Sequence, residues 1–309
     1  MDREKNLVRV LSENGGAVVL AVDSTQICRQ AERLHGTSAT MSAALGRLLT
    51  AAALMGSMLK SDEDSVTLKV NGGGPAGTLI AISDDSGNVR GSCDASLADL
   101  PLNPANGKLN VGGVVGRDGL LTVIRDMGLK GPYSGSVPLV SGEIAEDITS
   151  YFAASEQIPT VCALGVLVNP DLSVRAAGGY ILQLLPGATE QEISLIEKNI
   201  AAMDSVSSLI DAGKTPREIA FGVLDGFAPQ VLDEASCAYR CNCSREKMTG
   251  ALVSIGEEEL LRLSQEQRET EIVCGYCNKK YLFTDAQIIG LAGIARAGKA
   301  KKAGAADQK

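Results

Sequence analysis

The chain has 309 residues, 45% of them hydrophobic and 21% charged, and a formal net charge of −8 at pH 7. This hydrophobic fraction is enough for a buried core and excludes a disordered chain, and a length above about 250 residues favours more than one domain. The negative charge repels nucleic acid on average, which argues against a nucleic-acid-binding protein.

The first residues, MDREKNLVRV, are charged and lack the apolar run of a secretory signal. We therefore expect a cytoplasmic protein. The longest apolar segment, residues 43–59, contains Arg47 and is too short for a bilayer crossing, so we expect a buried helix and no membrane partner. Because the cytoplasm is reducing, the eight cysteines indicate free thiols or metal ligands instead of a disulfide framework.

Short apolar runs bounded by Gly, Asn and Asp predict strands in the first part of the chain, with helices between them. The predicted strands cover 17–22, 66–70, 79–82 and 161–168, and the predicted helices cover 26–35, 42–59 and 143–154. Because strands and helices do not alternate regularly, the pattern favours an α+β fold over a doubly wound sheet. This large mixed sheet-and-helix domain is assigned to residues 1–186, since Pro186 and Gly187 then interrupt the pattern.

Two amphipathic helices are predicted in a linker of residues 187–236. Thr189 and Glu192 have capping-box spacing at the start of the first helix, and Thr215 and Glu218 repeat it at the second. The first helix carries one apolar stripe at three- and four-residue steps, made of Ile193, Ile196, Ile200, Met203, Val206 and Ile210. Such a stripe is usually ordinary packing, but in a linker it can also be docked in one state and exposed in another.

Four of the cysteines form two close pairs, C-x-C at Cys241 and Cys243 and C-x-x-C at Cys274 and Cys277. Closely spaced thiolates can bind one ion, and four sulfur ligands suit tetrahedral zinc. The β-prone residues on both sides of CGYC place the second pair at the tip of a hairpin. A domain of this size has little core of its own, so metal is needed to hold it.

This small zinc-binding domain is assigned to residues 237–297, followed by a disordered basic tail of residues 298–309. Capping-box spacing predicts two helices within the domain, one starting at Ser254 and Glu257 and the other at Thr284 and Gln287. The two helices flank the hairpin in the chain.

The remaining cysteines receive different interpretations. Cys237 lies four residues before Cys241 and is an alternative metal ligand, whereas Cys28, Cys93 and Cys162 stand in apolar or turn contexts and are expected to be inert. A thioredoxin-type redox centre requires its C-x-x-C at the start of a helix, but a strand is predicted to follow CGYC.

Two further motifs are rejected. Gly72, Gly74 and Gly77 match G-x-G-x-x-G, but a strand follows where a dinucleotide site requires a helix. The Gly-Lys-Thr of SLIDAGKTP has Ser208 where a phosphate loop has its first Gly, and a helix precedes it instead of a strand. The single histidine, His35, is interpreted as a helix-end residue and not as a general base.

Several longer segments resemble a known family, the 33 kDa chaperonins, which are redox-regulated heat-shock holdases. The similarity extends over nearly the whole chain and includes HGTSATMSAALGRLLTAAALMG, GEIAEDITSYFAASEQIPT, AAGGYILQLLPGA and RCNCSRE followed by CGYC, in the family's order and spacing. The resemblance implies a cytoplasmic, ATP-independent chaperone that is not an enzyme. It also implies that the reduced protein holds zinc through Cys241, Cys243, Cys274 and Cys277.

The resemblance further implies that oxidation forms disulfides, releases zinc, unfolds the linker and favours homodimers that bind unfolded or oxidatively damaged proteins. The implied disulfides join Cys241 with Cys243 and Cys274 with Cys277, whereas the sequence itself leaves three pairings open. If the stripe from Ile193 to Ile210 depends on the zinc domain for its cover, its apolar face becomes available to clients on oxidation. Cys237 and the long basic tail depart from the family's pattern.

Two alternatives come from other functional classes. A zinc module that binds RNA would contact phosphates through its basic residues, Arg240, Arg245, Lys247, Lys279 and Lys280. The same charges are equally explained by the double negative charge of a four-thiolate zinc site. A thiol oxidoreductase would use CGYC and would turn over a dithiol substrate.

Overall fold

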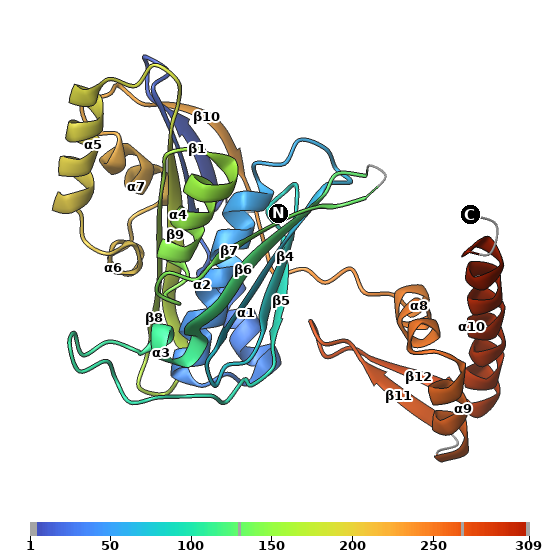
Figure 1. The fold of residues 1–309 in the computed structure, drawn as a ribbon. Coiled ribbons are helices and arrows are strands. Elements are labelled where there is room, and N and C mark those ends of the chain that lie inside the picture. The colour runs from blue at the N-terminus through green and yellow to red at the C-terminus, as the bar shows by residue number, and fades with distance from the viewer. Residues whose placement is uncertain (1–4, 129–130, 267–268, 307–309) are drawn as a thin grey trace. The chain divides into compact units, whose positions relative to one another are not determined.

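The computed structural model describes residues 5–128, 131–266 and 269–306, and it shows a mixed α+β protein (Figure 1). The chain divides into two compact units, Met1–Arg240 and Cys241–Lys309. The predicted α+β class is confirmed, since sheets and helices share the first unit without regular alternation.

The first unit contains two antiparallel sheets of five strands each. The first sheet has the order β10-β1-β2-β9-β8, and the second has the order β5-β4-β3-β6-β7. The strands of the first sheet are β1 (Leu7–Leu11), β2 (Ala17–Asp23), β8 (Thr160–Val168), β9 (Val174–Leu184) and β10 (Gln230–Ala235). Those of the second are β3 (Ser65–Gly73), β4 (Leu79–Asp84), β5 (Val89–Cys93), β6 (Gly116–Asp126) and β7 (Tyr133–Pro138).

Helix α2 (Ala39–Gly56) packs against strands of both sheets and is buried along almost its whole length (Figure 1). Its sequence is Ala- and Leu-rich on every side, as expected of a helix that is enclosed all round. It is long and apolar enough to cross a membrane, but 89% of it is buried inside the protein, as in the core helix of a folded domain. The helices around it are α1 (Thr25–His35), α3 (Val111–Val115) and α4 (Ala145–Tyr151), the last continued by a π-helical turn, η1 (Phe152–Glu156).

The strands predicted in this unit correspond to β2, β3, β4 and β8, and the predicted helices correspond to α1, α2 and α4. The glycine motif of residues 72–77 lies at the end of β3 and in the turn to β4. A side chain at Gly72 or Gly74 would collide with the backbone of residues 114–116, so these glycines permit close packing of the chain on itself. The motif is therefore part of a strand-to-strand turn, without the helix that a dinucleotide site requires.

The linker forms three helices, not two: α5 (Glu190–Ala202), α6 (Val206–Asp211) and α7 (Pro216–Val223). Both predicted capping boxes are present, at Thr189 and Thr215. The stripe predicted within one helix is interrupted, because Met203 adopts an extended conformation and Ser205 then caps α6 by accepting a hydrogen bond from the Ser208 amide. Ser205 therefore starts a new helix at a place where the apolar repeat alone predicts that the first helix continues.

Helices α6 and α7 pack on the outer face of the first sheet, and α5 packs on α7. Alternate residues of β2 show the two sides: Leu20 and Val22 join the core around α2, whereas Val19 and Ala21 pack against the linker. On the linker side the buried residues include Ile196, Val206, Ile210, Ile219, Val223 and Phe227. Within the predicted stripe, Ile196, Val206 and Ile210 are buried, and Ile193, Ile200 and Met203 are half-buried. The linker is therefore an integral layer of the first unit.

Residues 237–240 also belong to the first unit, although we assigned them to the zinc domain. The Val89 amide donates to the Ala238 carbonyl at 2.9 Å, and the Arg240 amide donates to the Val89 carbonyl at 2.7 Å. The Tyr239 hydroxyl donates to the Gly91 carbonyl at 3.0 Å. These bonds to β5 place the division between the units at Arg240 and Cys241.

The second unit contains one hairpin and three helices. Its elements are α8 (Arg245–Ile255), α9 (Glu257–Glu266), β11 (Glu269–Val273), β12 (Lys280–Thr284) and α10 (Asp285–Ala306). Its core is small and includes Leu252, Leu260, Tyr281, Phe283, Ile288 and Leu291.

The helix starts predicted in the second unit have different outcomes. Thr284 and Gln287 exchange hydrogen bonds at the start of α10, as predicted. Ser254 does not cap α9, because it lies in the last turn of α8 and donates to the Gly250 carbonyl. The predicted basic tail, residues 298–309, begins within α10, and its last three residues lie outside the described part of the chain.

Candidate metal centre

The two cysteine pairs lie on segments whose conformation is fixed locally. Cys241 and Cys243 precede α8, whose first turn is capped by Ser244 through a hydrogen bond from the Lys247 amide. Cys274 and Cys277 lie in the turn between β11 and β12, so the hairpin predicted from the sequence is confirmed. In this turn the Cys274 carbonyl accepts from the Asn278 amide at 2.9 Å. A single tight turn thus presents both sulfurs on one side.

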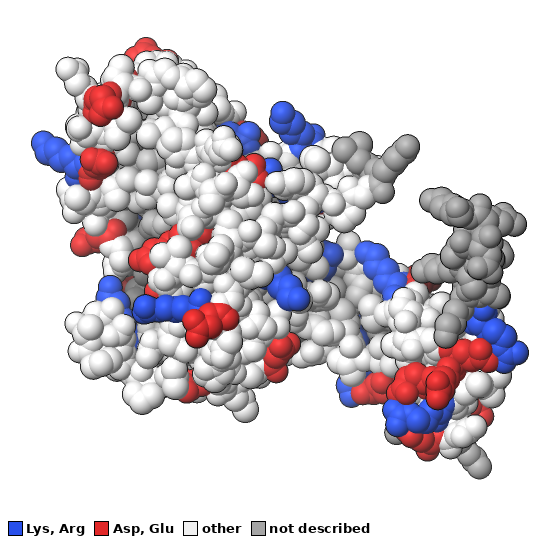
Figure 2. Space-filling view, viewed as in Figure 1, with Lys and Arg blue, Asp and Glu red and all other residues white. Residues whose placement is uncertain are grey.

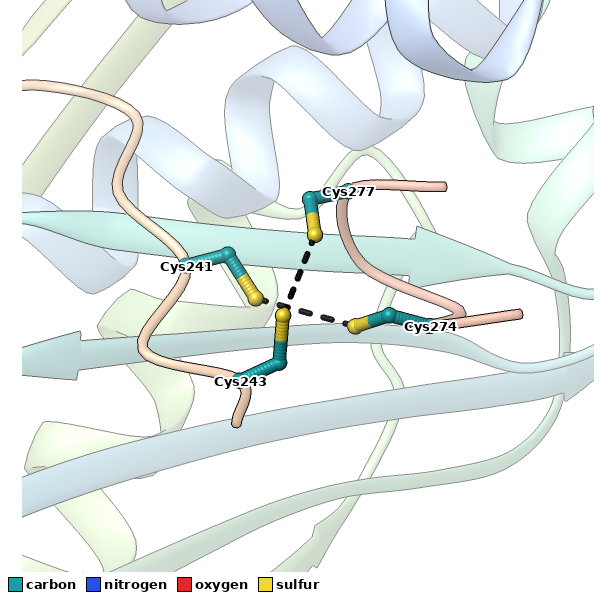
Figure 3. A group of neighbouring side chains, drawn as sticks. All are labelled: Cys241, Cys243, Cys274 and Cys277. Carbon is teal, nitrogen blue, oxygen red and sulfur yellow. Dashed lines mark hydrogen bonds between the residues drawn. The ribbon is translucent and has the colours of Figure 1, made fainter. Parts of the chain in front are cut away.

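The four sulfurs converge on one point (Figure 3), and all lie within 4.8 Å of one another. Cys241 Sγ is 3.7 Å from Cys274 Sγ, and Cys243 Sγ is 3.4 Å from Cys277 Sγ. A tetrahedral ion with metal–sulfur bonds of about 2.3 Å would place its ligands about 3.8 Å apart. The donor set can therefore hold one metal ion with little movement of the side chains.

Hydrogen bonds within the cluster favour negative charge on one sulfur in particular. Burial opposes ionisation of Cys243, but hydrogen bonds with Tyr281 and the other three thiols outweigh it and lower the pKa of Cys243 to about 7. Burial raises the pKa of Cys241 and, to a smaller extent, that of Cys277. Cys243 is thus the sulfur best prepared to act as a thiolate, which is the form that binds metal.

Tyr281 contacts the sulfur cluster, which the sequence interpretation missed. Its hydroxyl donates to Cys243 Sγ at 3.1 Å, and its ring is buried in the core of the second unit. Alternation in β12 could have revealed it, because residues 281 and 283 are the apolar positions that share one face of that strand with the hairpin's core.

Basic residues close to the cysteines in the chain make contacts within the unit. The Arg245 guanidinium lies 4.2 Å from the centre of the Phe283 ring and donates to Gln287, and the Lys279 ammonium lies 5.3 Å from the Tyr281 ring. Lys280 pairs with Glu271 at 3.0 Å. Acidic and basic side chains lie side by side on the face of this unit that Figure 2 shows, without one continuous basic surface.

Cys237 is not a member of the sulfur cluster. It lies in the first unit, where its amide donates to the side-chain oxygen of Asn6 at 2.9 Å and its thiol lies 3.7 Å from the same oxygen. The Asn6 side-chain amide donates in return to the Cys237 carbonyl at 3.2 Å. Burial raises the pKa of Cys237 to about 12. Its contacts are those of a structural residue that secures the segment after β10.

The three other cysteines lie apart from the cluster, as expected. Burial raises the pKa of Cys28 to about 12 and of Cys93 to about 11, and it raises that of Cys162 further. His35 ends α1, where its Nε2 atom lies 3.3 Å from the Tyr239 hydroxyl, and burial lowers its pKa. None of these four groups has the surroundings of an activated nucleophile or base.

Comparison with known proteins agrees with this arrangement. Residues 5–284 match the family described as Hsp33 protein. A 33 kDa chaperonin from Clostridium perfringens (strain SM101 / Type A) is 47% identical over 284 residues, which cover 91% of this chain and 89% of that protein. One from Clostridioides difficile (strain 630) is 44% identical over 283 residues, covering 92% and 97%. The crystal structure of an Hsp33 homologue from Thermotoga maritima superposes with a TM-score of 0.85 at 34% identity, covering 94% of this chain and 99% of that one.

Replacing a single cluster cysteine should abolish tight metal binding. Serine at position 241, 243, 274 or 277 leaves three sulfurs and an alcohol that does not ionise at neutral pH, so we expect one metal ion per chain in the parent and less than a tenth of that in each variant. Cys237→Ser should retain full metal content. Metal analysis by mass spectrometry tests both expectations, and full metal in Cys243→Ser with none in Cys237→Ser would show that the ligands are misassigned.

Native thiol reactivity should separate the cysteines into two classes. At pH 8 a thiol with a pKa of about 12 carries about a thousandfold less thiolate than one at the ordinary value of 9.0, so Cys28 and Cys237 should resist iodoacetamide in the folded, reduced and metal-loaded protein. Because the raised pKa keeps these two thiols protonated, their resistance to alkylation should persist until the pH approaches 12. Peptide mass spectrometry identifies the labelled residues, and rapid labelling of Cys237 beside the cluster cysteines would contradict the structural role.

Proposed function

The chain belongs to the Hsp33 family, and we propose that it is an ATP-independent chaperone whose client binding is switched on by oxidation of its four clustered cysteines. The observation that supports this most directly is the convergence of four sulfurs, two of which belong to the chain directly after residues 237–240, the segment that is bonded to Asn6 and β5. The homologues' chaperone identity extends to this chain as binding of client proteins. The switch is our proposal.

In the reduced protein, Cys241, Cys243, Cys274 and Cys277 would hold zinc. Four cysteine ligands in a closed tetrahedral arrangement are typical of structural zinc, and the sulfur separations of 3.4 and 3.7 Å are close to those that zinc requires. Bound zinc keeps all four donors as thiolates. In small modules it contributes roughly 10 to 16 kcal/mol, which is comparable with the whole stability of a domain. The second unit has a small core, so its order should depend on these ligands.

Oxidation removes the ligands. Two thiolates, one molecule of peroxide and two protons yield one disulfide and two molecules of water, so two peroxides convert the four donors into two disulfides. We propose the pairs Cys241 with Cys243 and Cys274 with Cys277, which follow the family resemblance. All four sulfurs lie within 4.8 Å of one another, so the members of each proposed pair are already neighbours in the reduced protein.

The chain connects the cysteines to the linker through a short segment. β10 pairs with β1 at the edge of the first sheet, residues 237–240 are bonded to Asn6 and β5, and Cys241 follows directly. We propose that disorder in the second unit loosens this segment and then α5, α6 and α7. Edge strands and peripheral helices are drawn from the part of a protein that opens most easily.

Opening of the linker would uncover an apolar surface on the first sheet. The side chains that it now covers are Val8, Val10, Ala17, Val19, Ala21, Ala176, Tyr180 and Leu182. Exposed apolar patches of this kind bind other apolar surfaces, such as those of unfolding or oxidatively damaged proteins, and also favour association of two copies into a homodimer.

The Gly-Lys-Thr sequence gives no support to a phosphate site, because its Lys214 pairs with Glu218 at 3.0 Å. We propose a cytoplasmic holdase that is not an enzyme.

Oxidation should change metal content, thiol count and structure together. Peroxide with mild heat should release the zinc, remove about four free thiols and lower the helix content, because disulfides cannot serve as thiolate ligands. Dithiothreitol with zinc should reverse all three changes. Metal analysis, thiol titration and circular dichroism provide the measurements, beside light scattering of a heated client. An oxidised sample that prevents aggregation while retaining its zinc would refute the switch.

Loosening the linker directly should activate the reduced protein. Ile196→Ala truncates a side chain that is 3% exposed and should cost about 2 to 5 kcal/mol in the local stability of α5, whereas the matched control Leu195→Ala alters a residue that is 36% exposed. With zinc bound, Ile196→Ala should suppress client aggregation and become sensitive to protease between residues 189 and 235. The control should behave like the parent. A variant that is cleaved there but remains inactive would show that linker opening is insufficient.

A further inference from the structure

Tyr281 links the two cysteine-bearing segments independently of any metal. It lies in β12, the strand that follows the second cysteine pair, whereas its hydrogen-bond acceptor Cys243 belongs to the first pair. The bond from Tyr281 Oη to Cys243 Sγ measures 3.1 Å, which is short for a contact with sulfur. It therefore positions Cys243 relative to the hairpin.

The phenol is held rigidly. Its ring is 7% exposed and belongs to the core of the second unit, with Phe283 two residues along the same strand. Tyr281 pairs with Ile272 across the hairpin, and the Lys279 ammonium covers the ring face at 5.3 Å. The hydroxyl cannot move away from Cys243 without disturbing this packing.

A donor fixed on a thiolate changes the chemistry of that sulfur. Oxidation begins when a sulfur lone pair attacks the O–O bond of a peroxide, giving a sulfenic acid and hydroxide. A second cysteine sulfur then displaces the sulfenic oxygen, forming the disulfide and water, with one proton taken up for each hydroxide released. A hydrogen bond to the first sulfur stabilises its lone pair and so slows the attack.

We propose that Tyr281 is the positioning residue that sets the oxidation threshold of the cluster, by restraining Cys243 and reducing its nucleophilicity until the hydrogen bond is lost. This inference rests on the metal centre and its oxidation proposed above, and it adds the group that decides how much oxidant the reduced protein tolerates. The restraint is local to Cys243. Partial unfolding of the hairpin, for example by heat, would remove it and raise the rate of oxidation.

The test is Tyr281→Phe in the full-length chain, which removes the hydroxyl and leaves the ring. Zinc stoichiometry should remain at one per chain, while zinc affinity, measured by competition with a chromophoric chelator, should fall about 10-fold. Peroxide should oxidise Cys243 of the zinc-loaded variant about threefold to tenfold faster than in the parent, as followed by quenched alkylation and mass spectrometry. With Co²⁺ in place of zinc, the sulfur-to-metal charge-transfer bands should shift to lower energy, because an unbonded thiolate is the better electron donor.

A matched control separates the hydrogen bond to sulfur from the general loss of a phenol. Tyr151→Phe removes a buried hydroxyl that donates to Glu156 at 2.6 Å in the first unit, and it should leave the cobalt spectrum and the oxidation rate of Cys243 unchanged. If Tyr281→Phe also leaves both unchanged, the inference is overturned while the metal centre stands. Faster oxidation with an unshifted cobalt spectrum would assign Tyr281 a packing role only and would equally overturn it. If the parent chain binds no metal ion, the proposed function itself fails.

Discussion

A sheet that is apolar on both faces needs a cover on each, and the first sheet of this protein has two covers of very different kinds. Helix α2 covers one face and is enclosed between the sheets, so it cannot leave without unfolding the unit. The linker helices α5, α6 and α7 cover the other face from outside, and of the thirteen residues of α5 only Ile196 is fully buried. The first sheet is therefore packed between an enclosed helix on one face and a peripheral helical layer on the other. If the linker helices were displaced, the newly exposed apolar face would still belong to a sheet whose other face is packed against α2.

The second unit differs from the first in the size of its core. Its apolar core is small, and the four clustered cysteines lie in it or pack against it. Ligands of this type couple folding to the redox state of the sulfurs, because thiolates bind metal and disulfides do not. The other cysteines are protected by burial, which raises the pKa of Cys28 and Cys237 to about 12. Under the proposed switch, oxidant would therefore react first at the clustered cysteines.

Local signals predicted much of this structure, and the failures have two causes: an overlooked local cap and contacts between distant residues. The short apolar run of β2, the apolar length of α2 and the spacing of the cysteine pairs each identify an element without reference to the rest of the chain. The break at Met203 was missed because the apolar repeat continues through it, and only the Ser205 cap shows where α6 begins. The place of Cys237 depends on Asn6, which is 231 residues away, and the role of Tyr281 depends on a sulfur 38 residues away. Contacts across such separations have no counterpart in a local pattern.

The central claim is that the state of the cysteine cluster controls whether the linker covers the first sheet. Hydrogen exchange of the reduced, zinc-loaded protein and of the peroxide-treated protein, resolved by peptide, tests it most directly. Oxidation should abolish protection in α5, α6, α7 and β10, while β3, β4 and β6 of the second sheet should keep theirs. Oxidised protein that binds a client while α5, α6 and α7 remain as protected as in the reduced form would contradict the account.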